Sequence, residues 1–162
     1  MKTLYLSDLD GTLLAPQACL SAFTAETVRR LLREGMAFSY ATARSFSTAK
    51  KVTAALGDAR LPVIVYNGEA IVDAGDGTVL DAVYFTPEEA AFVRDVLEAA
   101  RLRPMVYSRP AARVQAEHVA YLTQDCTRGL AYYLETRRGD ERLHAVEPEK
   151  LYDGRIFYFT VI

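Results

Sequence analysis

The chain has 162 residues and a formal net charge of −2; 51% of its residues are hydrophobic and 25% are charged. This length suits one domain or one and a half, and the composition is that of an ordinary globular protein. The small net charge argues against a nucleic-acid-binding surface, and no apolar run reaches the roughly 20 residues of a membrane span. The two cysteines lack metal-ligand spacing and the N-terminus lacks a signal-peptide layout, so we expect a cytoplasmic protein with reduced thiols.

An apolar run at the N-terminus ends in two carboxylates. Residues 4–6 lead into Asp8 and Asp10, and Gly11 follows directly. This pattern predicts a buried strand that delivers both acids into a loop, on one side, because alternate residues of an extended segment point the same way. Like charges this close need a cation between or beside them, and Mg²⁺, which takes oxygen ligands, is the expected partner. Gly11 would let the backbone approach a ligand closely.

Alternating strands and helices follow and predict an α/β fold. We expect a helix over 24–34 capped by Thr24, a strand over 36–41, a helix over 47–56 and a strand over 62–66. Strands joined by helices through short links are typical of a parallel sheet with crossover helices. Thr42, Arg44 and Asn67 come after the second and third strands, at the edge where open α/β sheets place their ligands.

The pattern changes near residue 70. Residues 70–73 and 78–84 flank Ala-Gly-Asp-Gly, which predicts a hairpin. Thr86, Pro87 and Glu89 then supply the N-cap, N1 proline and capping-box glutamate of a helix that runs to about residue 100. The elements expected beyond it are strands over 105–108 and 113–116, a helix over 127–136, a charged loop over 137–142 and a strand over 155–162. We therefore expect an α/β domain over residues 1–80 and an α+β domain over 81–162.

Three segments carry a resemblance to a known family. Asp-Leu-Asp-Gly-Thr-Leu-Leu, over residues 8–14, resembles the first signature of the haloacid dehalogenase-like (HAD) phosphohydrolases. Thr-Ala-Arg over 42–44 resembles the Thr-Gly-Arg of the Cof-type, sugar-phosphatase-like branch, with alanine in place of glycine. Asn-Gly-Glu-Ala over 67–70 resembles that branch's Asn-Gly-Ala, with one extra residue. The resemblance implies a Rossmann-like parallel core followed by an inserted α+β cap, of which this chain would hold a part.

The resemblance also implies a reaction and assigns residues to it. Asp8 would be the nucleophile that forms an aspartyl phosphate, and Asp10 the acid and base that serves the leaving alcohol and the attacking water. Mg²⁺ would be held by Asp8 and Asp10 and would contact a phosphate oxygen. The expected phosphate- and substrate-binding residues are Gly11, Thr42, Arg44 and Asn67. The implied substrate is a small phosphorylated metabolite, with a sugar phosphate as the first candidate.

Two parts of the family's machinery have no counterpart in this sequence. They are a lysine that follows the cap and a Gly-Asp-rich acidic loop, and none of Lys50, Lys51 and Lys150 stands in a matching context. We therefore expect the first part of a longer phosphatase, ending within its cap, with exposed strand edges that favour self-association. Two alternatives stay open: a catalytically silent binding or oligomerising fragment, and a sugar-phosphate mutase, since such mutases also use Asp-x-Asp-Gly-Thr.

The two histidines predict no site of their own. His118 and His144 are 26 positions apart and have no ligand-like spacing. We expect them to be isolated residues on the surface or in the packing of the α+β part.

Overall fold

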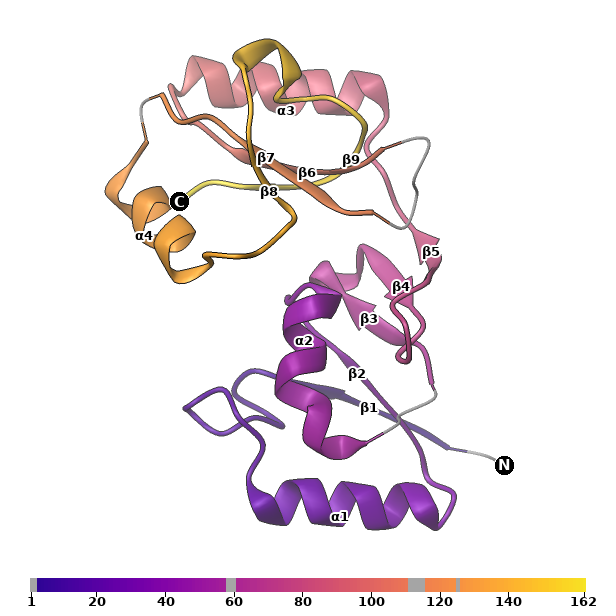
Figure 1. The fold of residues 1–162 in the computed structure, drawn as a ribbon. Helices are drawn as coiled ribbons and strands as arrows, with labels where there is room; N and C mark the ends of the chain where they lie inside the picture. The colour runs from indigo at the N-terminus through magenta and orange to yellow at the C-terminus, as the bar shows by residue number, and fades with distance from the viewer. Residues whose placement is uncertain (1–2, 58–60, 111–115, 125) are drawn as a thin grey trace. The chain divides into compact units, whose positions relative to one another are not determined.

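A computed structural model describes residues 3–57, 61–110, 116–124 and 126–162. The chain forms two compact units, Met1–Ala82 (unit 1) and Val83–Ile162 (unit 2), and each has its own sheet (Figure 1). The division falls two residues after the boundary expected from the sequence. Within the described ranges, no helix combines the length and the apolar character that a membrane crossing requires.

Unit 1 is built on a five-stranded sheet in the order β1-β2-β3-β4-β5. Its elements are β1 (Leu4–Asp8), α1 (Ala22–Arg33), β2 (Ala37–Ala41), α2 (Phe46–Thr53), η1 (Ala54–Leu56), β3 (Val63–Val65), η2 (Tyr66–Gly68), β4 (Ala70–Val72) and β5 (Val79–Ala82). β1, β2 and β3 are parallel neighbours, and β4 and β5 are added antiparallel as a hairpin. The expected α/β fold with a parallel core is confirmed, and the hairpin belongs to the same sheet.

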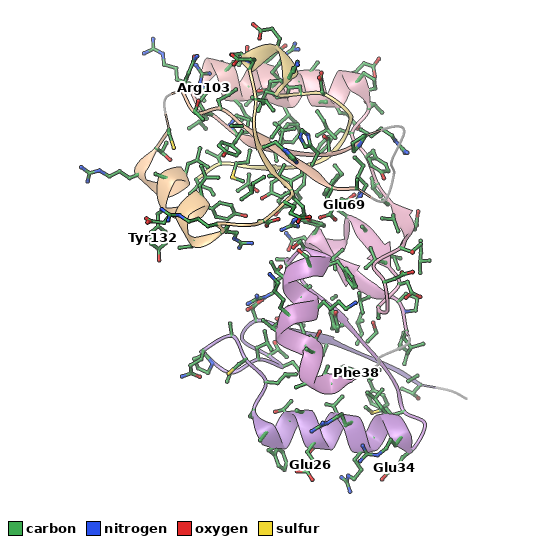
Figure 2. All side chains as sticks on the ribbon, viewed as in Figure 1. Glu26, Glu34, Phe38, Glu69, Arg103 and Tyr132 are labelled. Atoms are coloured by element: carbon green, nitrogen blue, oxygen red, sulfur yellow. The ribbon has the colours of Figure 1, made fainter. Side chains whose placement is uncertain are left out.

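Helix α1 covers one face of this sheet. Ala25 and Val28 of α1 are buried, and Val28 packs in one cluster with Phe38 of β2. Figure 2 labels Phe38. The expected cap of this helix is wrong by three residues. The N-cap is Ser21, whose hydroxyl oxygen accepts a hydrogen bond from the Thr24 backbone N–H at 3.0 Å. The helix begins one turn early because a serine three residues before Thr24 supplies the same capping chemistry.

Strand β1 is not the buried strand that its apolar sequence predicted. It lies at one edge of the sheet, and Leu4, Tyr5 and Leu6 are 58%, 54% and 52% exposed. Because successive side chains of a strand point to opposite faces, apolar groups are exposed on both faces of β1. An edge strand of this kind offers backbone hydrogen-bonding groups and apolar surface together, which favours pairing with another strand.

Unit 2 is built on a four-stranded sheet in the order β8-β7-β6-β9, and its described residues form two α-helices. Its elements are α3 (Pro87–Ala99), β6 (Met105–Arg109), β7 (His118–Tyr121), α4 (Arg128–Thr136), β8 (Leu143–Ala145), η3 (Pro148–Lys150) and β9 (Arg155–Thr160). The two helices and the strands β6 and β9 match the expected elements. The expected strand over 113–116 lies mainly outside the described residues, whereas β7 and β8 had no counterpart in the sequence analysis.

Helix α3 has a complete N-terminal cap and an apolar face without a fully buried residue. The capping box is complete: Thr86 N–H donates to Glu89 Oε2 at 2.8 Å, and Glu89 N–H donates to Thr86 Oγ1 at 3.2 Å. The apolar face of this helix is only partly covered, since Val96 is 52% exposed. Ala90, nearer the N-terminus, packs against the buried cluster of the unit, which contains Val106 and Ile156.

His118 and His144 form a pair, so their expected isolation is wrong. Their ring centroids are 4.1 Å apart, with 40° between the ring planes. The parallel pairing of β7 with β8, which places Ala120 opposite His144, brings the two rings together. Burial chiefly, and then the neighbouring His144, lower the pKa of His118, while Asp153 opposes them.

This pair predicts a loss of stability in mild acid. Because the folded pKa of His118 lies below its ordinary value of 6.5, the unfolded chain takes up the proton first as the pH falls. The free energy of unfolding should therefore decrease from about pH 7.5 to about pH 5.5. The described carboxyls with lowered pKa, Asp10, Asp76 and Asp140, affect the free energy of unfolding only at lower pH. Urea unfolding at both pH values should show a smaller decrease for His118→Asn, and an unchanged decrease would contradict the assignment.

Candidate active site

The expected site residues all lie in unit 1, at the carboxyl ends of three neighbouring parallel strands. Asp8 ends β1 and is paired in register with Ala41, which ends β2. One residue further, the backbone N–H of Thr42 donates to the carbonyl of Ile64 in β3 at 3.0 Å. The parallel pairing therefore sets the loops that follow β1, β2 and β3 side by side, as expected for an α/β ligand site.

The loop after β1 is a tight turn around the two acids. The backbone N–H groups of Thr12 and Leu14 both donate to the carbonyl of Leu9, at 3.3 and 2.8 Å. Gly11 has a φ of +78°, a backbone conformation that residues other than glycine adopt only with strain. The hydroxyl of Thr12 donates to Asp8 Oδ2 at 3.2 Å. The turn thus fixes the Asp8 carboxylate through a residue to which the sequence analysis gave no role.

Arg44, an expected phosphate ligand, binds Asp10 in the structure. Its Nη2 lies 2.6 Å from Asp10 Oδ1 and its Nε lies 2.7 Å from Asp10 Oδ2, a bidentate arrangement. The hydrogen bond from Arg44 holds the pKa of Asp10 below its ordinary value. Asp10 is therefore ionised in this arrangement. To take up a proton and then donate it, Asp10 has to lose Arg44 to another anion.

The loops after β2 and β3 are joined by backbone hydrogen bonds. Asn67 N–H donates to the carbonyl of Thr42 at 3.1 Å, and Tyr66 N–H donates to the carbonyl of Arg44 at 3.0 Å. Asn67 and Gly68 have φ values of 60° and 95°, so the chain reverses sharply here. Thr42 is buried, and its hydroxyl oxygen accepts the Arg44 backbone N–H at 3.2 Å. The Thr42 hydroxyl can also donate its hydrogen to an acceptor such as a phosphoryl oxygen.

The donors of this site suit a hard cation, although they are few. The described part of the chain contains no group of three or more His, Cys, Asp or Glu side chains that could hold a metal ion. Mg²⁺ commonly uses one or two carboxylates and completes its octahedral shell with water and substrate phosphate. Asp8 and the backbone carbonyl of Asp10 supply oxygen donors of this type, whereas the Asp10 carboxylate is already engaged by Arg44. The residues present therefore fit Mg²⁺ as a partly hydrated ion.

Comparison with known proteins gives matches along most of the chain. The family model of the haloacid dehalogenase-like hydrolases matches residues 5–151. Two curated proteins named "Putative phosphatase" are similar: one from Buchnera aphidicola subsp. Baizongia pistaciae is 35% identical over 94 residues, and one from Haemophilus influenzae is 34% identical over 68 residues. These segments span 57% and 42% of this chain, and 33% and 25% of the relatives.

Solved structures have the same fold at low sequence identity. A protein from Streptococcus mutans matches 99% of this chain and 57% of its own, with a TM-score of 0.71 and 15% identity. A HAD-superfamily phosphatase from Bacteroides thetaiotaomicron matches 94% of this chain and 52% of its own, with a TM-score of 0.66 and 20% identity. A HAD subclass IIB sugar phosphatase matches 95% of this chain and 56% of its own, with a TM-score of 0.66 and 14% identity. The chain spans about half the length of these structures. On the family match over residues 5–151, it belongs to the haloacid dehalogenase-like hydrolases.

Proposed function

We propose that this chain carries the catalytic loops of a Mg²⁺-dependent phosphohydrolase that acts on a small phosphorylated metabolite. The observation that supports this most directly is the grouping of Asp8, Asp10 and Thr42 at the carboxyl ends of β1 and β2, two adjacent parallel strands. This grouping combines a nucleophile, a proton carrier and a hydroxyl donor for phosphoryl oxygens, which a phosphomonoester hydrolase needs.

Asp8 and Asp10 divide the reaction between them. An oxygen of Asp8 attacks phosphorus, the bond from phosphorus to the alcohol oxygen breaks, and protonated Asp10 gives its proton to that oxygen. Water then attacks the aspartyl phosphate, Asp10 takes a proton from it, and the bond between Asp8 and phosphorus breaks. Inorganic phosphate leaves, and both side chains return to their starting states.

Arg44 links substrate binding to the protonation of Asp10. A phosphate dianion competes with the Asp10 carboxylate for the guanidinium, because both accept two parallel N–H bonds. When Arg44 turns to the phosphate, Asp10 loses the contact that holds its pKa down and can take up a proton. Mg²⁺, held by Asp8 and the Asp10 carbonyl, would offset the negative charge of the phosphoryl oxygens.

The proposed substrate class is the sugar phosphates. The HAD subclass IIB sugar phosphatase that shares this fold supports this class. The experiment is to measure phosphate release from a panel of hexose and pentose phosphates and 4-nitrophenyl phosphate, with Mg²⁺ and with excess EDTA. Release that depends on Mg²⁺ is the expected result. Phosphorus-31 NMR of the products separates the alternatives: a phosphorylated isomer indicates a mutase, and unchanged substrate with folded protein indicates a catalytically silent fragment.

We also propose that two copies of the chain associate through the edge of β1. The exposed apolar residues Leu4, Tyr5 and Leu6 are the basis for this proposal. Leu6→Lys should shift the mass measured by light scattering toward the monomer, because a charged edge residue opposes strand pairing. Leu102→Lys, at a 42% exposed leucine of unit 2, is the control and should leave the mass unchanged. Monomer at every concentration of the unmodified chain would refute the proposal.

A further inference from the structure

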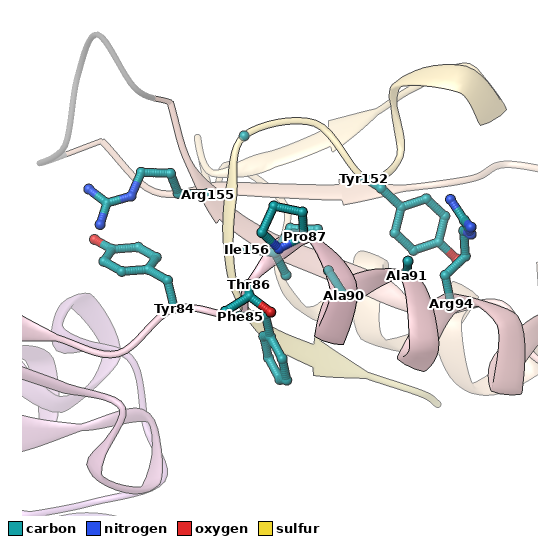
Figure 3. Close-up of a pocket in the computed structure, with 11 residues that line it drawn as sticks. Tyr84, Phe85, Thr86, Pro87, Ala90, Ala91, Arg94, Tyr152, Arg155 and Ile156 are labelled. Atoms are coloured by element: carbon teal, nitrogen blue, oxygen red, sulfur yellow. The ribbon is translucent and has the colours of Figure 1, made fainter.

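Unit 2 contains a pocket whose walls come from two distant parts of its sequence. Its volume is about 520 Å³, and it lies between the first turns of α3 and the segment that enters β9 (Figure 3). This volume is within the range of small-molecule sites. The two walls are joined where the backbone N–H of Phe85 donates to the carbonyl of Ile156 at 2.9 Å. All of the lining residues fall within 84–156, so none of them belongs to the loops that hold Asp8 and Asp10.

Small residues keep this pocket open. Ala90 and Ala91 face it from α3, and Gly154 faces it from the other wall. Gly154 has a φ of +90°, and a Cβ there would lie 3.0 Å from Ser108 Oγ and 3.3 Å from the Arg109 carbonyl oxygen. The glycine therefore lets the chain pass close to β6, and the alanines leave room in front of it.

The polar side chains of the pocket are cationic or neutral. Figure 3 shows Arg155 beside Tyr84 on one side, and Tyr152 beside Arg94 on the other. The Arg155 guanidinium carbon lies 3.8 Å from the centroid of the Tyr84 ring, which holds the guanidinium by one face and leaves its N–H edge for an acceptor. Among the described lining residues none is acidic, and no carboxylate in the described ranges lies within 4 Å of Arg155.

The arginine on the other side of the pocket, Arg94, is paired with a carboxylate. Arg94 donates from Nε and Nη2 to Asp95 Oδ1, at 3.0 and 2.9 Å. Burial, helped by Glu98, raises the pKa of Tyr152, so its hydroxyl stays protonated near neutral pH and can donate a hydrogen bond. The side of the pocket with Arg155 is therefore the better anion site, and Tyr152 offers a neutral donor opposite it.

We propose that this pocket binds a small organic anion with an apolar, ring-sized body. The carboxylate or phosphate of the ligand would take the free edge of Arg155, and its body would pack on Phe85 and Ala90. Charge-assisted bidentate contact with a guanidinium favours these two anionic groups. The apolar wall favours a ring over a fully hydroxylated body. The proposal is independent of the phosphohydrolase reaction.

Nuclear magnetic resonance titration of the full chain tests this proposal. The probes are benzoate and phenylphosphonate, with neutral benzyl alcohol as the comparison, in EDTA so that no metal recruits the anions. Both anions should give saturable shifts of the amides of 84–94 and 152–156, with affinities about ten-fold or more above that of benzyl alcohol. Arg155→Gln should weaken benzoate binding by about ten-fold or more. Ala91→Leu, which fills the pocket, should abolish it.

Arg138→Gln is the matched control, since Arg138 is 81% exposed and does not line the pocket. It should bind benzoate like the unmodified chain. Non-saturating shifts up to about 50 mM, weaker than the mM affinities of simple anion sites, would overturn the proposal. So would equal affinity for benzyl alcohol, or benzoate affinity unchanged in Arg155→Gln. If Arg155→Gln loses its dispersed spectrum, the Ala91→Leu result decides alone, because Ala91 lines the pocket and is not among the residues packed against the buried cluster of unit 2.

Discussion

Asp8→Asn is expected to reduce phosphate release by about 10⁴-fold or more, as removal of an enzyme's nucleophile does. An amide oxygen does not attack phosphorus at a useful rate, and no covalent intermediate can form at this position. Asp10 remains in place but has no aspartyl phosphate to hydrolyse. Release of inorganic phosphate from the best substrate of the panel, compared at equal protein concentration, measures the loss.

The same substitution should leave the fold intact. Asparagine keeps an oxygen that can accept the Thr12 hydroxyl, which lies 3.2 Å from Asp8 Oδ2 in the structure. It also removes one of two carboxylates that lie one residue apart in the sequence, which relieves their repulsion. The midpoint of thermal unfolding should therefore be unchanged or higher. A large loss of activity together with a higher midpoint would separate a catalytic role of Asp8 from a structural one.

Asp81→Asn is the matched control for Asp8→Asn. Asp81 is an exposed acid on β5, in the same unit, and the substitution makes the same change in charge. It should keep full activity, because it is not among the residues of the three catalytic loops. Activity retained in Asp8→Asn would mean that the nucleophile lies elsewhere. An equal loss in both variants would mean that the overall charge of unit 1, and not the Asp8 carboxylate, controls the reaction.

The sequence predicted elements whose signals are local. Helix α3 follows from Thr86 and Glu89, because both groups of a capping box are three residues apart. Strands β7 and β8 were missed because they are short, with four and three residues, and because both are defined by pairing with distant segments. The burial expected for β1 was wrong for a related reason: an apolar sequence shows that a strand can be buried but does not show what covers it.

The same distinction applies to the site. Parallel strands end at one edge of a sheet, so the placement of Asp8 and Thr42 near each other could be predicted from the order of the elements alone. The contact between Arg44 and Asp10 spans 34 positions and depends on how one long side chain folds back across the loops. The pairing of His118 with His144 depends in turn on β8. Neither contact can be predicted from residue spacing, because each joins two segments that only the fold brings together.

Glu117→Gln is expected to destabilise unit 2 by about 3 kcal/mol, since it removes a charge that faces two poorly hydrated guanidiniums. Glu117 Oε1 lies 3.4 Å from Arg109 Nη2, and Oε2 lies 3.0 Å from Arg142 Nη1. The Arg109 side chain is fully buried, and the side chains of Glu117 and Arg142 are 16% and 15% exposed. The Arg109 guanidinium also lies 4.0 Å from the centroid of the Phe157 ring, so it cannot move into water without disturbing the sheet.

Glu135→Gln makes the same chemical change in an exposed pair and serves as the control. Glu135 and Arg138 are 68% and 81% exposed at 3.4 Å, so water already screens their attraction. The control should lose less than about 0.5 kcal/mol, the range of surface ion pairs. Urea unfolding followed by circular dichroism measures both variants. Equal losses would contradict the argument, because burial, and not the presence of an ion pair, is what makes removal of the Glu117 charge costly: the Arg109 guanidinium stays buried whether or not a carboxylate faces it.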